Sequence, residues 1–139
     1  MQVSAVVQFW GSAQANRLNI CIDGGWAVDA VLGVQTRPHG DLDIALPASE
    51  VIALRALLNG GGFSEVSRPD SWEHNFVLQS ASGDIIDVHS YELNSDGSNK
   101  EGVAYMADHM CGEGIVLGYR IRCVPPRWFV PFHTGYDVD

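Results

Sequence analysis

Asp23-Gly24-Gly25-Trp26 opens the stretch that decides the fold, and Asp41-Leu42-Asp43-Ile44 closes it. The run 18–22 before the glycine pair is short, apolar and β-branched, so it predicts a buried strand. After the pair, apolar residues recur at helical spacing as far as Gly33, which is a typical helix stop. We therefore expect a strand, a tight glycine turn and a helix in direct succession.

The glycine turn is a candidate anion site. Gly24 and Gly25 allow the backbone to bend sharply and allow a ligand to come close. The first N–H groups of a helix are free, and they face any phosphate placed at its positive dipole end. A lone Gly-Gly pair is more often an ordinary strand-to-helix turn, so this motif needs support from elsewhere in the chain.

Support comes from three acids in strand-like surroundings. Residues 41–46 alternate strictly, so Asp41 and Asp43 project from one face of a strand. A solvated strand face is the plain alternative, but Asp87 lies in a similar run, 85–89. Magnesium prefers carboxylate and phosphate oxygens. Three carboxylates on neighbouring strands beside a helix start suit two-metal phosphoryl transfer.

These motifs together resemble a known family. Gly24-Gly25, Asp41-x-Asp43 and Asp87 look like the core of the minimal nucleotidyltransferase superfamily, which is of the polymerase-β type. The string 23–44 is similar to the antibiotic nucleotidyltransferases, especially the lincosamide group, to which the aminoglycoside 2''-adenylyltransferases are related. Ile86-Asp87-Val88-His89 and Phe132-His133-Thr134-Gly135-Tyr136 match as well.

The resemblance implies an α/β fold, α+β by another convention, in which helices pack mainly on one face of a mixed sheet. It covers the chain from about residue 18, and residues 1–139 are expected to form one domain. It implies magnesium-dependent transfer of AMP, or another nucleoside monophosphate, from a nucleoside triphosphate to a hydroxyl of a small antibiotic-like molecule. A lincosamide is the first expectation for that molecule, and an aminoglycoside is the alternative.

The resemblance also assigns roles to residues. Asp41 and Asp43 would bind both magnesium ions, or one magnesium ion together with the triphosphate of ATP. Asp87 would share the metal or accept the proton of the substrate hydroxyl. The expected nucleotide-binding residues are Gly24, Gly25, Trp26 and Arg37, and the expected substrate residues are His89, His133 and Tyr136.

Two residues of the loop 33–40 carry alternatives. Arg37 could reach a phosphate as a planar, permanently charged donor, or it could be a surface arginine. His39 is expected only to orient Asp41.

Composition limits the partners. The 139 residues carry a formal net charge of −9 with only eight lysines and arginines, which disfavours nucleic acid as a substrate. An acidic surface suits a cationic small molecule, whereas ATP would need magnesium to balance its charge. The three cysteines show no metal-binding spacing, so we expect free thiols in a reducing cytoplasm.

We also expect no signal peptide and no membrane partner, since no run of about 18 apolar residues occurs. A homodimer is plausible by analogy with the family.

Two other classes of protein are disfavoured by the sequence. A non-catalytic nucleotidyltransferase-like module, of the kind found in toxin–antitoxin pairs, has no need for three repelling acids. A transferase acting on RNA ends is disfavoured by the sequence pI of about 4.7.

The remaining elements follow from periodicity. The predicted helices are 3–16 and 49–58, the second with Ser49 as its N-cap, and the predicted strands are 63–67, 74–79, 85–91 and a pair or one long strand over 115–124. Residues 94–99 read as a turn, and a short helix is expected from Pro125. His74 reads as a hydrogen-bonded structural histidine. Members of the resembling family usually continue beyond the segment 132–136 with an acidic stretch and a helix, which we expect this sequence, ending at Asp139, to lack.

Overall fold

The computed structural model of the chain describes residues 1–125 and 128. The helices are α1 (Val3–Ala15), α2 (Gly24–Leu32) and α3 (Val51–Gly60), with short 3-10 turns η1 (Ala48–Glu50) and η2 (Ala107–Met110). The strands are β1 (Cys21–Asp23), β2 (Asp41–Pro47), β3 (Phe63–Val66), β4 (Asn75–Ser80), β5 (Ile85–Leu93), β6 (Asn99–Gly102), β7 (Gly112–Val116) and β8 (Tyr119–Cys123).

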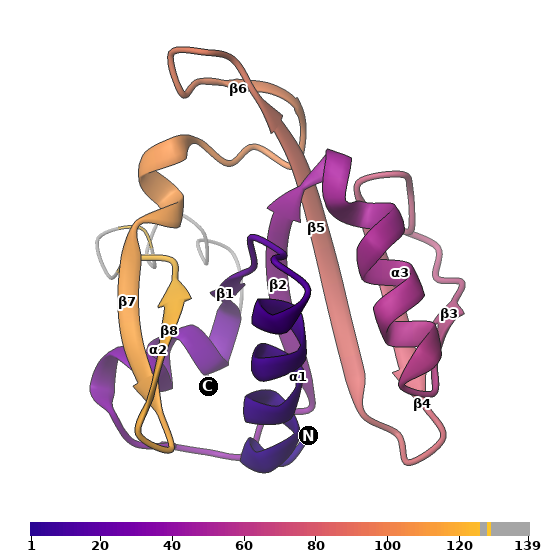
Figure 1. Cartoon of the computed structure of the whole chain (residues 1–139), viewed down its shortest axis with the longest axis vertical. Coiled ribbons are helices and arrows are strands. Elements are labelled where there is room, and N and C mark those ends of the chain that lie inside the picture. The colour runs from indigo at the N-terminus through magenta and orange to yellow at the C-terminus, as the bar shows by residue number, and fades with distance from the viewer. Residues whose placement is uncertain (126–127, 129–139) are drawn as a thin grey trace.

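The described strands form one mixed sheet (Figure 1), in the order β3-β4-β5-β2-β1-β8-β7, with β6 paired to β5. The pairs β2–β5 and β1–β8 are parallel, and the others are antiparallel. The predicted mixed α+β architecture is therefore confirmed.

The main core lies on one face of this sheet. Leu42, Ile44 and Leu46 of β2 are fully buried, and they belong to one cluster with buried residues of α1, α2 and α3. In Figure 1, α1 and α3 run side by side across the strands, while α2 lies beside the β7–β8 hairpin. The alternate residues of β2, including both acids, consequently point to the opposite face.

The helix predicted after the glycine pair is present with both of its ends. The Asp23 side chain accepts a hydrogen bond of 2.8 Å from the backbone N–H of Gly24, which caps α2. Gly33 ends the helix in the left-handed region, with φ of 75°. Helix α2 therefore begins directly where β1 ends.

Several local predictions need correction. Ser49 does not cap a helix, because residues 48–50 form η1 and α3 begins at Val51 without a side-chain cap. Glu50 instead accepts hydrogen bonds from the backbone and side-chain nitrogens of Asn19, at 2.6 and 2.7 Å. The first strand pairs only over Cys21–Asp23, although Leu18 and Ile20 are buried as expected.

The second half of the chain follows the predicted strands with one addition. The region 112–123 is a hairpin of two strands, so the alternative of one long strand is wrong. The polar strand β6 follows the 94–99 turn and was not predicted. The helix expected from Pro125 falls largely outside the described residues. None of the described helices has the length and apolar character needed to cross a membrane.

Candidate active site

Parallel pairing of β2 with β5 brings the acids together. Asp43 lies directly opposite Asp87, and Asp41 lies opposite Ile85. Side chains alternate along each strand, so Asp41, Asp43 and Asp87 share the face that the helices leave uncovered, and all three are half-buried. His89, two residues beyond Asp87, projects from the same face.

His89 sits between two of the acids. Its Nε2 atom is 3.6 Å from an oxygen of Asp43 and 3.7 Å from an oxygen of Asp87. Burial acts against a charge on this ring, but the facing carboxylates of Asp43 and Asp87 outweigh burial, so the pKa of His89 is raised. Asp43, Asp87 and His89 each offer one ligand atom, and these atoms lie within 4.8 Å of one another.

Burial and mutual repulsion outweigh the positive groups near Asp41 and Asp87. Burial, followed by the charges of Asp43 and Asp87, raises the pKa of Asp41. Burial also raises the pKa of Asp87, although His89 and a hydrogen bond from Asn75 act in the other direction. Carboxylates that repel one another in a partly desolvated site fit a divalent cation with oxygen ligands.

The glycine turn closes the site beside Asp43. Gly24 has φ of 65°, and a Cβ atom at this position would overlap the carboxylate of Asp43. A Cβ atom at Gly25 would overlap the ring of His39. Both glycines are therefore required by close approach, and the first N–H groups of α2 lie next to the acids.

Trp26 and His39 lie behind this turn. The Trp26 side chain is 2% exposed and belongs to the main core, which leaves its backbone as the part that a phosphate could reach. The His39 ring packs 4.7 Å from Trp26, centroid to centroid, and its Nε2 atom hydrogen-bonds Asp29. The expectation that His39 orients Asp41 is thus replaced by a contact that anchors the loop to α2.

Arg37 and Arg68 differ in their relation to the three acids. Arg37 is exposed in the loop 33–40, and in the described part of the chain no contact links its guanidinium to the acids. Arg68, in the loop after β3, is the arginine whose charge lowers the pKa of both Asp41 and Asp87. Sequence analysis missed Arg68 because it is a single exposed residue in a loop, and only the sheet order places it beside the acids.

Two further polar contacts border the site and were also missed. The Tyr105 hydroxyl donates a buried hydrogen bond of 2.7 Å to Asp23, which lies opposite Asp43 in the sheet. The Asn75 amide donates to Asp87 at 2.9 Å. The Asn75 contact depends on strand register, and the Tyr105 contact joins residues 82 positions apart, so the sequence carries no local signal for either. His133 and Tyr136 lie outside the described residues, so their predicted roles stay predictions.

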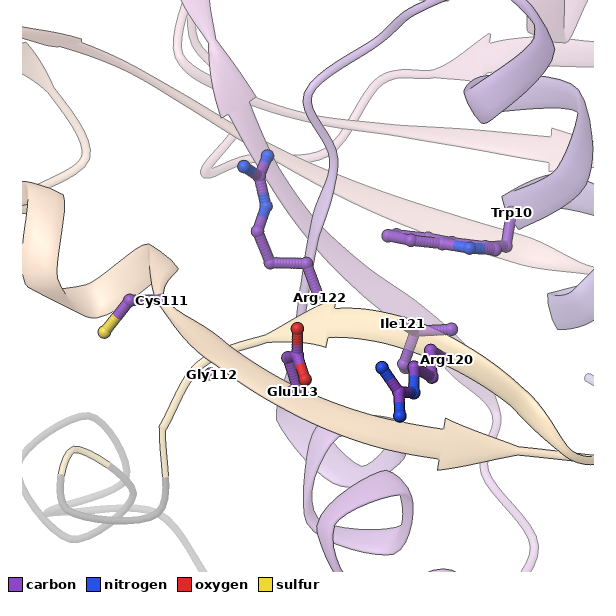
Figure 2. A pocket seen from close by; sticks show the side chains of 7 residues that line it. All are labelled: Trp10, Cys111, Gly112, Glu113, Arg120, Ile121 and Arg122. Carbon is purple, nitrogen blue, oxygen red and sulfur yellow. The ribbon is translucent and has the colours of Figure 1, made fainter.

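A pocket of about 270 Å³ occurs away from the acids (Figure 2). The indole of Trp10 on α1 faces the β7–β8 hairpin across it, and Glu113, Arg120 and Arg122 line the hairpin side. None of the three acids lines this pocket. The candidate active site is instead the polar sheet face beside the glycine turn.

A mixed sheet with a glycine turn before a helix and acids on two adjoining strands is a fold that this chain shares with solved nucleotidyltransferases. The chain belongs to the aminoglycoside-2''-adenylyltransferase family, whose model matches residues 5–139. The predicted family and enzyme class are confirmed.

Individual relatives agree with this assignment. The chain is 38% identical over 133 residues to a 2''-aminoglycoside nucleotidyltransferase of Klebsiella pneumoniae, a match that covers 88% of this chain and 67% of that protein. It is 32% identical over 123 residues to a lincosamide resistance protein of Staphylococcus haemolyticus, covering 84% and 74%.

Solved structures support the same fold. The lincosamide antibiotic adenylyltransferase LnuA, with lincomycin bound, superimposes with a TM-score of 0.79 at 24% identity, over 95% of this chain and 85% of that one. ANT(2'')-Ia in complex with adenylyl-2''-tobramycin gives a TM-score of 0.76 at 25% identity, over 89% and 69%.

Proposed function

We propose that the chain transfers AMP from ATP to a hydroxyl group of a small antibiotic-like molecule and requires magnesium to do so. The hydroxyl oxygen attacks the α-phosphorus, the bond to the β-phosphate breaks, and pyrophosphate leaves. The observation that carries the proposal is the placement of three half-buried acids on one sheet face, with Asp43 against the start of α2.

Asp41 and Asp43 are the residues we assign to metal and triphosphate. Both project from the same face of β2, and Gly24 packs against Asp43 so closely that no larger residue fits. Bound magnesium, for which we propose two ions, would neutralise charge on the triphosphate and on the leaving pyrophosphate. The free N–H groups at the start of α2 would hold the β- and γ-phosphates.

Asp87 is the residue we assign to the acceptor hydroxyl and, with Asp43, to the metal. It lies on the neighbouring strand β5, and its raised pKa reflects a carboxylate that favours a proton or a cation more than a surface acid does. A general base must reach the proton that it removes, and Asp87 lies across the strand pair from the proposed triphosphate site. His89 would steady both Asp43 and Asp87 from between them.

Two acceptor classes are distinguished by different observations. A lincosamide is favoured by the similarity to the Staphylococcus haemolyticus protein and by the lincosamide-like string 23–44. An aminoglycoside is favoured by the family model and by the higher identity to the Klebsiella pneumoniae protein. The net charge of −9 also suits a polycation, because opposite charges accelerate encounter.

The test is pyrophosphate release by the purified chain with ATP and magnesium, measured separately with lincomycin, tobramycin and RNA. We expect release with one antibiotic class and none with RNA. The Asp41→Asn variant is the control for contaminating activity. Release that needs neither antibiotic, or release driven by RNA alone, would contradict the proposal.

A further inference from the structure

We propose that Asn75 is a positioning residue that fixes one oxygen of Asp87 and so presents the other oxygen to the reaction. The inference rests on the proposed role of Asp87. It concerns a side chain that the family motifs do not include and that only the register of the sheet brings to the site.

The backbone of Asn75 is held by a tight turn. The backbone N–H of Trp72 donates to the Asn75 carbonyl at 2.9 Å, and the N–H of Asn75 donates to the Trp72 carbonyl at 3.1 Å. Asn75 begins β4 and pairs with His89 of β5. Residues paired across two strands share a face, so the Asn75 side chain lies on the face that carries Asp87 and His89.

The side-chain amide of Asn75 makes two hydrogen bonds. Its Nδ2 atom donates to Asp87 Oδ1 at 2.9 Å and to the carbonyl of Val88 at 3.1 Å. The second bond fixes the amide to the backbone of β5, so the first bond holds Asp87 Oδ1 at a defined place. A donor that is itself anchored to the backbone restricts the carboxylate more than a flexible contact would.

The two oxygens of Asp87 therefore differ. Oδ1 receives the amide of Asn75 and lies 3.7 Å from His89. Among the described residues, no hydrogen bond or ion pair is made to Oδ2. This arrangement leaves Oδ2 as the oxygen that can take the proton of the substrate hydroxyl or bind a cation. Because Asn75 is neutral, it fixes the carboxylate without the charge neutralisation that a lysine or arginine would bring.

Loss of such a partner is expected to be costly for the chemical step. Residues that orient a metal ligand typically contribute about 10–100-fold to metal affinity or activity. We expect Asn75→Ala to lower kcat within this range while the KM for ATP changes by less than about threefold, because the triphosphate is assigned to Asp41 and Asp43. Mn²⁺ alone, titrated into the nucleotide-free protein by calorimetry, should bind at least a few-fold more weakly.

Gln79→Ala is the matched control, since Gln79 is a half-buried amide on the same strand and face, opposite Ile85. It should leave kcat, KM and Mn²⁺ affinity unchanged. Asn75→Asp is the second variant, because it keeps the size of the side chain but cannot donate to Asp87. Its kcat should fall at least as far as that of Asn75→Ala. Because it keeps the side-chain size, it tests the inference independently of how well the alanine variant folds.

A double-mutant cycle decides whether Asn75 acts through Asp87. In an Asp87→Ala background, Asn75→Ala should cause no further loss of kcat. The inference is overturned if the effects of Asn75→Ala and Asp87→Ala on kcat are fully additive. It is also overturned if kcat is unchanged in both Asn75 variants, or if the KM for ATP rises while kcat is retained. If the proposed role of Asp87 is itself wrong, Asp87→Asn keeps a normal kcat. That result distinguishes a failure of the proposed function from a failure of the inference about Asn75.

Discussion

Asp41 and Asp43 show how little the identity of a residue says until its neighbours are known. Each is an ordinary acid in the sequence, but on β2 they share a face with Asp87, and burial and repulsion raise the pKa of Asp41 despite the charges of Arg68 and His39. Burial and mutual repulsion would be costly in a chain that made no use of them. Their arrangement is therefore best explained by a cation that compensates the charge.

We predict that Asp41→Asn and Asp43→Asn each reduce turnover by at least about 10³-fold, because each removes charge stabilisation worth several kcal/mol in the transition state. Both variants should remain folded, since loss of a repelling carboxylate does not harm the apo protein. The measurement is pyrophosphate release at saturating magnesium together with a thermal melt. Near-normal rates in either variant would defeat the metal assignment.

Gly24 offers a second test at the same scale. An L-residue at its φ of 65° is strained by about 1–2 kcal/mol, and a Cβ atom would also overlap the Asp43 carboxylate. Gly33→Ala is the matched control, because Gly33 has φ of 75° but open space around it. We expect both variants to be destabilised in urea, but only Gly24→Ala to lose most of its activity. Equal activity in the two variants would show that the turn has no part in catalysis.

The sequence predicts the position of a site residue when it follows from side-chain alternation along one strand. It does not predict a position that depends on how two strands pair. Asp41, Asp43 and Asp87 lie on one face because the side-chain period of a strand is two. Asn75 and Arg68 become neighbours of these acids only when β4 and β5 pair as they do. Arg37 lies in an exposed loop, so its expected role at the phosphates stays a prediction.

At the scale of elements, α2 and the loop behind it behave as one unit. Asp29 of α2 accepts hydrogen bonds from the backbone N–H and hydroxyl of Thr36, at 3.1 and 2.6 Å, and pairs with His39. Asp29 is buried, and His39 packs against both Trp26 and the Gly25 turn. The loop that leads into Asp41 is thus attached to the helix that would hold the phosphates.

We predict that Asp29→Ala destabilises the fold by about 2–3 kcal/mol, since it leaves the buried ring of His39 and the donors of Thr36 without a charged partner. Although burial acts in the opposite direction, the hydrogen bonds from Thr36 and His39 lower the pKa of Asp29 below its usual value. The folded state therefore holds the ionised form more strongly than the unfolded chain does. This contribution is complete above the unfolded pKa of about 3.9 and is lost as the pH falls through the lower folded pKa.

The measurement is urea unfolding of the parent chain and of Asp29→Ala between pH 7 and pH 3. The difference in unfolding free energy should be constant near neutrality and shrink below about pH 4. Asp70→Ala is a suitable control, because Asp70 is an exposed acid in the loop after β3. A difference that is independent of pH would contradict an ionised Asp29 as the anchor.

Elements with strong patterns were predictable, and elements defined by pairing were not. Helix α2 was predicted because glycines mark both of its ends. Strand β6 reads Asn-Lys-Glu-Gly, which has no strand propensity, and it exists because β5 extends far enough to pair with it. Ser49 had the right residue type for a cap, but α3 begins two residues later, at Val51, after a 3-10 turn.

At the scale of the whole molecule, an acidic chain must bind an anionic nucleotide. The formal net charge of −9 disfavours free ATP, and the three acids of the site add local repulsion. A divalent cation relieves both repulsions, because it pairs with the carboxylates on one side and with the phosphates on the other. Metal and nucleotide should therefore bind with positive coupling, each improving the affinity of the other.

We predict that magnesium and ATP together raise the melting temperature by more than the sum of their separate effects. A ligand that binds only the folded state stabilises it by RT ln(1 + [L]/Kd), about 2.7 kcal/mol when its concentration is about 100 times Kd. ATP alone should give almost no shift, since its charge opposes that of the site, and magnesium alone should give a small one. The measurement is a thermal melt at millimolar concentrations, with Asp43→Asn as the control in which the coupled shift is lost. A curve that Mg-ATP leaves unchanged, or an equal shift with ATP and a chelator, would show that the acids do not form a metal-dependent nucleotide site.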